Sequence, residues 1–482
     1  MLRLIFSLLS IVPLLAAAFT LTVEPGELAT LQPRLALHSA ITVSGQVNAA
    51  DLVYLADSVP AGAALDLGDV AIAAYDGKSV GHGVSKAAAD ELPPYILAGL
   101  RASRFVLPSG LKTIGRGALL DSEISAIDIP AGVKEIGEHS FAACRKLTKV
   151  SFESGCSIES VSSRAFDGCV LLEEIEVPAS VAVIGQRAFA GCNSLSAFKF
   201  PTHLEAIGEE AFAASGIEGA ELSECRRLRH IGARAWAECT ALASVSLPSA
   251  AVLGGNAIFM GCPSLTEVTL PASASSLPAL TLAGASSLES IVLPEGTDSI
   301  GALAFAGVAE IRELTLPASL TGIGQGAFEG WKSLVEVDAR AIEGGVPSLG
   351  EGVWAGVDQS QVILRVPRQF EQAYLDADQW RDFSITTSAI LEVPADGISG
   401  TNLVCVSASF DDRVLTVSSD APIVSVRVYA LDGTTVAVRP SAQADARTVK
   451  VNTSQLSGSV FVVSVLSAEG GDSPVVFKLL RR

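Results

Sequence analysis

Residues 184–201 read IGQRAFAGCNSLSAFKFP, and residues 322–337 repeat the pattern as GIGQGAFEGWKSLVEV. In both stretches an aromatic residue follows a Gly-x-x-Ala step, at what we call the spine position. The spine position recurs along the chain every 22 to 26 residues, most often every 23, and Leu119 and Leu282 also occupy it. A fixed period of this length is typical of a repeat protein, and chance recurrence in an ordinary globular domain would not hold one phase. The aromatic residues at the spine position are Phe141, Phe166, Phe189, Phe212, Trp236, Phe259, Phe305, Phe328 and Trp354.

Each repeat also contains a short segment of the form L-x-x-I-x-L, as in residues 172–177, 195–200 and 265–270. Its alternation indicates a β-strand that turns apolar side chains to one face. A proline after many of these segments ends the strand, because proline cannot donate a ladder hydrogen bond. Glycine four residues before the spine position, as at Gly208 and Gly324, is expected to permit a turn, and the step after it to be helical in character.

One such repeat cannot bury its apolar side alone, whereas stacked repeats pair strand with strand and bury a continuous aromatic column. The sequence therefore predicts a mainly β fold with short helical turns: a solenoid with parallel strands, held by a structural spine of the nine aromatic residues. Burial of one ring is expected to contribute about 1.5–3 kcal/mol.

The repeats closely resemble BspA-like leucine-rich repeats, and VPRQFEQAYLDADQWRDF at 366–383 resembles the closing repeat of that family. The resemblance covers roughly residues 100–385 and implies a leucine-rich-repeat solenoid over residues 99–385 of a bacterial surface protein. The repeat at 136–160 departs by lacking the strand-end proline and adding two residues, and the repeat at 254–281 has lost its Ile-Gly. These departures are expected to change local curvature only.

The N-terminus reads as a secretory signal peptide over residues 1–18, with Arg3, a mostly apolar stretch at 4–15, and alanines at 16–18. The apolar stretch is too short to span a bilayer comfortably and no later run is long enough, so we expect export without a transmembrane anchor. Residues 19–98 have no clean period. Their order is similar to the segment before the repeats in many BspA-like proteins, which predicts an N-terminal cap region.

A Ser/Thr/Gly-rich linker at 386–403 precedes a β-rich region, residues 404–482, that reads as a small β-sandwich. VRVYALDGTTV, VNTSQLSGSVFVVSV and VVFKLLRR resemble the sorting domain of the type IX secretion system, although Ser-Val-Phe follows Gly458 where that family usually has Gly-x-Tyr. The resemblance implies export by the type IX machinery, removal of this domain and an outer-membrane-associated location on the cell surface. A β-sandwich binding module is the alternative.

The formal net charge is −19, from 33 Lys and Arg against 52 Asp and Glu. Such a surface repels phosphate backbones and anionic lipid, so nucleic acid and membrane surfaces are disfavoured as partners. The five histidines lack metal-ligand spacing, and neither H-E-x-x-H nor G-x-S-x-G occurs. We therefore expect no enzymatic activity, no cofactor and no metal site.

Five cysteines stand three residues after the spine position, where other repeats hold small or apolar residues. We expect a buried column of reduced thiols, with disulfides between adjacent repeats as the alternative in an oxidising compartment. The cysteines are Cys144, Cys169, Cys192, Cys239 and Cys262.

The x positions of the strands are expected to form a long exposed surface that is acidic, rich in hydroxyls and nearly free of aromatic residues. Such a surface suits a basic protein segment, from host extracellular matrix or another bacterial surface, better than a sugar, whose binding usually uses stacked rings. A structural or display solenoid without a specific ligand is the alternative, and a surface hydrolase is a remote one. The candidate binding residues are Lys149, Glu174, Glu176, Lys199, Glu267, Glu313, Glu336 and Asp338.

Overall fold

The computed structural model describes residues 18–386 and, beyond them, the strands that lie between residues 406 and 480. The chain forms two compact units, Met1–Thr386 and Thr387–Arg482. The expected signal peptide, apart from Ala18, and the expected linker, apart from Thr386, lie outside the described residues.

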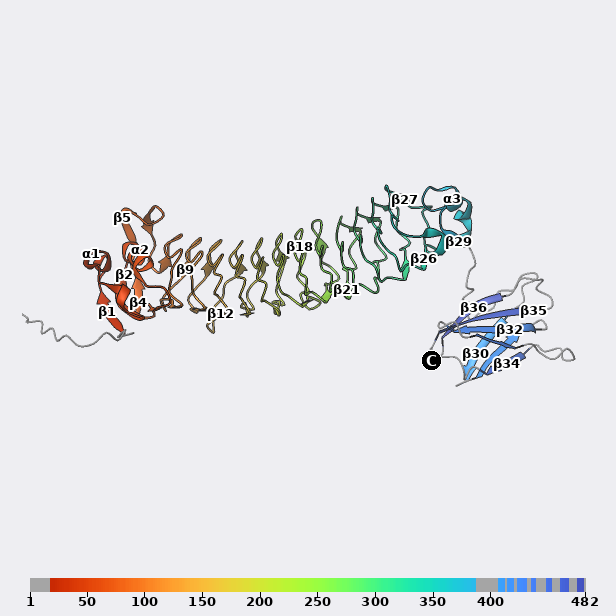
Figure 1. Ribbon diagram of the computed structural model, residues 1–482, viewed down its shortest axis with the longest axis horizontal. Coiled ribbons are helices and arrows are strands. Elements are labelled where there is room, and N and C mark those ends of the chain that lie inside the picture. The colour runs from red at the N-terminus through yellow and green to blue at the C-terminus, as the bar shows by residue number, and fades with distance from the viewer. Residues whose placement is uncertain are drawn as a thin grey trace, which may run out of the picture. The chain divides into compact units, whose positions relative to one another are not determined.

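The first unit is a solenoid of successive coils with a ladder of parallel strands along one side (Figure 1). Four strands within residues 19–98, the expected cap region, join the same sheet as the first repeats. This ladder runs through β1 (Phe19–Val23), β2 (Ala40–Val47), β3 (Ala64–Asp66), β8 (Arg104–Val106), β10 (Ala126–Ile129), β12 (Lys149–Phe152) and β14 (Glu174–Ile175), with β4 (Val70–Ile72) also paired to β2.

Two further ladders continue along the later coils. Residues 195–200 and 288–293 contain no strand, so the surface is divided into three ladders; we call their exposed side the strand face. The second ladder comprises β17 (Gly219–Glu221), β19 (Ser244–Ser246) and β21 (Glu267–Thr269). The third comprises β24 (Glu313–Thr315), β26 (Glu336–Asp338), β28 (Ile363–Arg365) and β29 (Ser384–Thr386).

Shorter parallel strands pair along another edge of the coils, just before each turn that carries the spine position. They are β7 (Glu91–Leu92), β9 (Thr113–Ile114) and β11 (Glu135–Ile136); then β13 (Ser160–Val161), β15 (Val183–Ile184), β16 (Ala206–Ile207), β18 (His230–Ile231) and β20 (Val252–Leu253); then β22 (Ser276–Leu277), β23 (Ser299–Ile300), β25 (Gly322–Ile323) and β27 (Ser348–Leu349).

Helices and one hairpin lie at the ends of this unit. The N-terminal end has α1 (Glu27–Leu31), a 3-10 turn (Leu35–Leu37), α2 (Ala49–Ser58) and the hairpin of β5 (Tyr75–Val80) and β6 (Val84–Ala87). The C-terminal end has 3-10 turns at Gln359–Gln361 and Arg368–Phe370 and the helix α3 (Glu371–Asp376).

The rings of the nine aromatic residues lie inside the coils, each at most 2% exposed. From Phe141 to Phe259 neighbouring rings stack nearly parallel with centroids 5.2–5.8 Å apart. The buried Leu282 interrupts the stack, which resumes from Phe305 to Trp354. The parallel solenoid, the predicted fold class, is confirmed, and stacked aromatic pairs add to the stabilisation that ring burial supplies.

Glycine four residues before the spine position has a different role from the one expected. Gly208 and Gly324 do not have positive φ. A Cβ atom at Gly208 would lie 2.5 Å from Gln186 N, and one at Gly324 would lie 2.5 Å from Ala302 N. Explaining these glycines by turn geometry was therefore wrong, because they are required where the backbones of adjacent coils touch.

The step that carries the spine position is not helical, which corrects the second local expectation. Around Phe189, three overlapping turns are closed by Ala188 N to Gly185 O, Ala190 N to Arg187 O and Cys192 N to Phe189 O. Arg187 (φ 53°) and Gly191 (φ 69°), two residues before and after the ring, are left-handed. Turns with a left-handed third residue reverse the chain within a few residues, which a helix would not.

The second unit consists of antiparallel strands in two sheets, an arrangement typical of a β-sandwich. Alternate residues of β31, β32 and β34 are buried, among them Val417, Val428 and Val451. One sheet is ordered β30 (Val406–Asp411), β31 (Val414–Ser419), β34 (Thr448–Asn452). The other is ordered β33 (Thr435–Val438), β32 (Ile423–Ala430), β35 (Val460–Ser467), β36 (Val475–Leu480).

Candidate functional site

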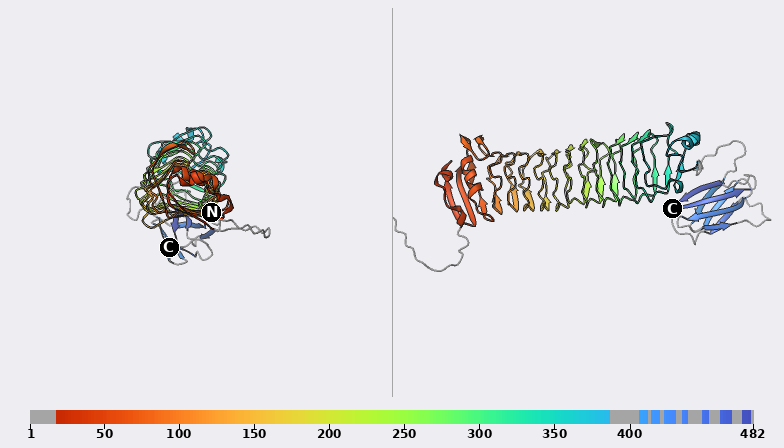
Figure 2. Two further views of the ribbon diagram at one scale, coloured as in Figure 1. Left: turned by 90° about the vertical axis from the view of Figure 1, so that its left-hand side faces the viewer. Right: turned by 45° about the horizontal axis from the view of Figure 1, so that its top comes forward.

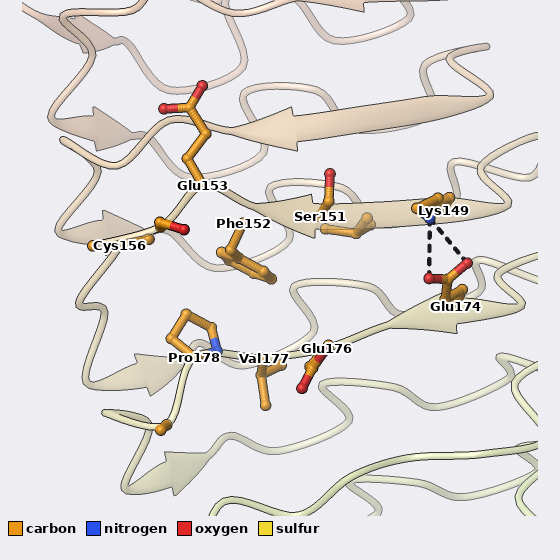
Figure 3. A pocket seen from close by; sticks show the side chains of 13 residues that line it. Lys149, Ser151, Phe152, Glu153, Cys156, Glu174, Glu176, Val177 and Pro178 are labelled. Atoms are coloured by element: carbon orange, nitrogen blue, oxygen red, sulfur yellow. Dashed lines mark hydrogen bonds and ion pairs between the residues drawn. The ribbon is translucent and has the colours of Figure 1, made fainter.

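The strand face brings four of the candidate residues together as two ion pairs between adjacent coils. Lys149 of β12 lies opposite Glu174 of β14, with 3.0 Å between Nζ and Oε1 (Figure 3). Lys199 contacts Glu176 of the preceding coil at 3.0 Å. All four side chains are at least half exposed, so each pair contributes at most about 1 kcal/mol. Their main effect is to neutralise charge in the first part of the face.

Glu336 and Asp338 are held by arginines that the sequence analysis did not single out. Arg365 Nε lies 2.6 Å from Glu336 Oε1, and the Arg365 side chain is only 17% exposed. Arg340 Nη2 lies 2.7 Å from Asp338 Oδ2. Burial alone would raise the pKa of Asp338, but hydrogen bonds from Arg340 hold that pKa below its usual value. Residues 363–365 form one more strand in register with β26. Extending the strand pattern to these residues would have identified Arg365 as a partner of Glu336.

Glu267 and Glu313 are exposed, and neither has an ion-pair partner among the described residues. Glu313 lines a hollow of about 640 Å³ together with Glu289 and Arg312. The structure thus separates the candidate set into six residues whose charges are compensated by neighbours and two whose carboxylates remain available.

A second hollow, of about 360 Å³, lies where the repeat at 136–160 departs from the pattern. Phe152 is half exposed there, although Ile129, its register partner in β10, is buried. Figure 3 shows Phe152 and Cys156 on one coil above Val177 and Pro178 of the next, with the Lys149–Glu174 pair at the other end of the hollow. The missing proline and the added residues therefore open the surface locally.

A charge network on the turns was missed by sequence reasoning. Arg187 binds both carboxylate oxygens of Asp167 at 3.1 Å, and it also contacts Glu210. Glu210 in turn accepts a hydrogen bond from Arg234 at 3.1 Å. The signal was present as alternating charge two residues before the spine position in three successive repeats. The network links four coils.

The cysteine column donates hydrogen bonds to the backbone of the preceding coil. Cys169 Sγ lies 3.1 Å from Phe141 O, and Cys192 Sγ lies 3.2 Å from Phe166 O. In a later coil Trp331 takes the same place, with its Nε1 donating to Phe305 O at 2.8 Å. The described cysteines are free, and burial raises the pKa of the Cys192 thiol. Such thiols are poor nucleophiles.

The described residues were also compared with the requirements of a metal site and of a membrane-spanning helix. Residues 18–386 and the described strands contain no group of three or more His, Cys, Asp or Glu side chains that could hold a metal ion. The same residues include no helix with the length and apolar character needed to cross a bilayer. His139 is half-buried, and burial together with Arg116 and Arg164 lowers its pKa.

Parallel coils, close-packed glycines and a buried spine define the class as a leucine-rich-repeat solenoid. The family described as BspA type leucine rich repeat region (6 copies) matches residues 91–160, 112–227, 159–278 and 222–335, which together span about half of the 482-residue chain. The chain belongs to this family.

Solved structures include a leucine-rich repeat protein from Bacteroides ovatus, 24% identical, with a TM-score of 0.52 over 62% of this chain and 81% of that chain. That likeness shows the fold alone. A leucine rich cell surface protein from Faecalibacterium prausnitzii is 23% identical over 54% of this chain and 86% of that chain, with a TM-score of 0.32. The pneumococcal vaccine antigen PcpA is 18% identical over 65% and 76%, with a TM-score of 0.35. Comparison with curated proteins found no match.

Proposed function

We propose that this protein is a secreted cell-surface protein whose strand face binds another protein, without catalysing a reaction. The observation that carries the proposal is the pair of uncompensated carboxylates, Glu267 and Glu313, on a surface whose spacing is fixed by strand register. A surface that is already ordered loses little conformational entropy when a partner binds. Membership of the BspA-type family supports an interaction or display role.

The ligand class follows from the chemistry of the face. Carboxylates and hydroxyls dominate its exposed positions, and the neighbouring Glu289 adds further negative charge at the second gap between ladders. A basic, extended segment of a host matrix protein or of another cell's surface protein would complement this charge. Complementary charge raises the rate of association and selects among partners more than it raises affinity.

Charge reversal tests the proposal. Glu267→Lys with Glu313→Lys is compared with the matched pair Glu159→Lys with Glu205→Lys, which changes net charge equally at exposed positions away from the strand face. Binding of the purified chain to a panel of purified matrix proteins is measured by surface plasmon resonance. We expect the first variant to bind about tenfold more weakly, a loss of about 1.4 kcal/mol, and the control to bind as the original does. Equal binding by both variants would contradict the proposal.

A display solenoid without a specific ligand is the second candidate. The Lys149–Glu174 and Lys199–Glu176 pairs favour it, because they neutralise the first part of the face without any partner. If neither the original chain nor the face variant binds any protein of the panel, and cells lacking the protein adhere normally, the display function replaces the binding function.

Export and sorting are proposed on separate grounds. The signal-like start at residues 1–18 supports export, and the resemblance of residues 404–482 to the type IX sorting domain supports delivery to the outer surface. Mass spectrometry of the protein from mature cells would then find a chain that starts near residue 19 and is cut between residues 385 and 405. A surface-retained chain with an intact C-terminus would argue against sorting.

A further inference from the structure

The N-terminal end of the solenoid presents an edge strand without charged residues. Within the described residues β1, with the sequence FTLTV, pairs only with β2. Phe19 and Leu21 are only partly buried against the core, whereas their register partners Ile41 and Val43 are each 1% exposed. An uncharged, apolar edge strand that none of the described elements covers is a template for pairing with another chain.

Two exposed leucines follow this strand closely in the chain. Leu31, at the end of α1, is 60% exposed, and Leu37 is 74% exposed. α1 and β1 lie together at the outer end of the solenoid (Figures 1 and 2). Terminal coils of soluble solenoids normally present a polar outer side. This end therefore has the apolar character of a contact surface.

The segment that carries these leucines is firmly held. The buried carboxylate of Asp51 accepts hydrogen bonds from Gly26 N at 2.6 Å and from Ala29 N at 3.0 Å. Phe19 packs on His38 with ring centroids 4.8 Å apart. A contact surface that is fixed in this way needs little rearrangement to bind.

At the opposite end of the solenoid, aromatic side chains pack against one another. Trp380 is 1% exposed and donates from Nε1 to Pro347 O at 3.0 Å, and Phe383 packs on Trp354 at 5.1 Å. Tyr374 of α3 is fully buried beside Trp380. Leu375 of α3, at this end, is 45% exposed, which is less than Leu31 and Leu37 at the N-terminal end.

Charge favours a second copy of this chain as the partner. Residues 19–38 contain Glu24, Glu27 and Arg34, a balance of −1, in a chain whose total is −19, so two copies meet there with little repulsion. Antiparallel pairing centred on Leu21 places Thr20 opposite Thr22 of the second copy. It also separates the two Glu24 carboxylates to opposite ends of the ladder, because strands advance about 3.3 Å per residue.

We propose that β1 is a dimerisation edge, through which two copies join by antiparallel β1–β1 pairing about a two-fold axis. The pairing extends the first sheet across both copies and leaves both strand faces available. It does not depend on the binding function proposed above, since its test contains no ligand.

Analytical ultracentrifugation of the full chain, secreted from a bacterial host and with its first residue identified by mass spectrometry, measures the stoichiometry. We expect two copies for the original chain and one copy for Thr20→Lys with Thr22→Lys, because each new cation faces another across the ladder. Thr20→Lys with Thr22→Glu is expected to restore two copies by facing opposite charges. Ser384→Lys, on the exposed edge strand β29 at the other end, is the control and is expected to leave two copies.

Circular dichroism confirms that each variant is folded, since Thr20 and Thr22 are exposed and outside the core. A monomeric original chain, or a Thr20→Lys, Thr22→Lys variant that remains dimeric, would overturn the proposal. A monomeric Thr20→Lys, Thr22→Glu variant would overturn the antiparallel register on which it rests.

Discussion

Removing one ring from the spine should weaken several coils together. Phe189 is fully buried and stacks on Phe166 and on Phe212, each at 5.4 Å, while Phe198 meets its edge at 5.1 Å. Phe189→Ala would leave a cavity bounded by the rings of three coils. We therefore expect a large and local loss of stability.

The size of the loss follows from burial and ring contacts. Truncation of a buried Phe to Ala costs about 3–5 kcal/mol. Three ring contacts, each worth about 0.5–1.5 kcal/mol beyond area burial, place Phe189→Ala in the upper part of that range. Phe189→Leu should cost less than half as much, because Leu282 shows that leucine fits the spine position while fully buried.

Hydrogen exchange read by mass spectrometry, together with urea unfolding, measures this effect coil by coil. Nearest-neighbour coupling in a solenoid predicts lost protection around Phe166 and Phe212, and little change near Trp354. Leu171→Ala, at a residue 46% exposed, is the matched surface control. If Phe189→Ala costs no more than this control, the stacked spine does not hold the coils together.

Three further results are expected. Gly208→Ala should destabilise the chain by about 1–3 kcal/mol in urea unfolding, because its Cβ would meet the backbone of Gln186. Gly296→Ala is the control and should leave the stability unchanged, because a Cβ there meets nothing within 4 Å. Equal losses in the two variants would contradict close contact between the coils. The lowered pKa of His139 means that the folded state resists protonation, so the free energy of unfolding should fall as pH drops from about 7.5 to about 5. His139→Asn should reduce that fall. If the free energy of unfolding of this variant depends on pH as in the original chain, His139 is not its cause. In the folded chain, alkylation followed by mass spectrometry should modify the half-buried Cys156 before Cys169 or Cys192, whereas bridged pairs would refute the reduced column.

Periodicity was sufficient to predict the parallel solenoid, because a single row of large apolar residues can be buried only by stacking. The spine position and the strands were therefore readable from residues such as Phe212 and Val268 alone. Local geometry was not readable in the same way. The glycine at 208 could serve either a left-handed turn or a close contact, and only the position of the neighbouring backbone distinguishes the two.

The sequence predicted the composition of the candidate surface but not the ion pairs within it. The sequence places Lys149 and Glu174 in one column, yet their contact depends on the register between β12 and β14. Arg365 lies on β28 in register with β26, and its ion pair removes Glu336 from the set of available carboxylates. Gaps between ladders, such as the one at residues 288–293, arise from small differences between repeats. The periodic pattern shows only what the repeats share, so it does not predict these gaps.

The stacking of coils one repeat apart is tested most directly by engineered disulfides. Ser276 and Ser299 are register partners whose hydroxyl oxygens lie 2.9 Å apart, and Gly322 lies in the same column one coil further on. Under mild oxidation, Ser276→Cys with Ser299→Cys should form a disulfide that peptide mass spectrometry locates, because paired strands fall within disulfide range. Ser276→Cys with Gly322→Cys should not cross-link. Linkage of the second pair, or failure of the first in the folded chain, would contradict the stacked solenoid.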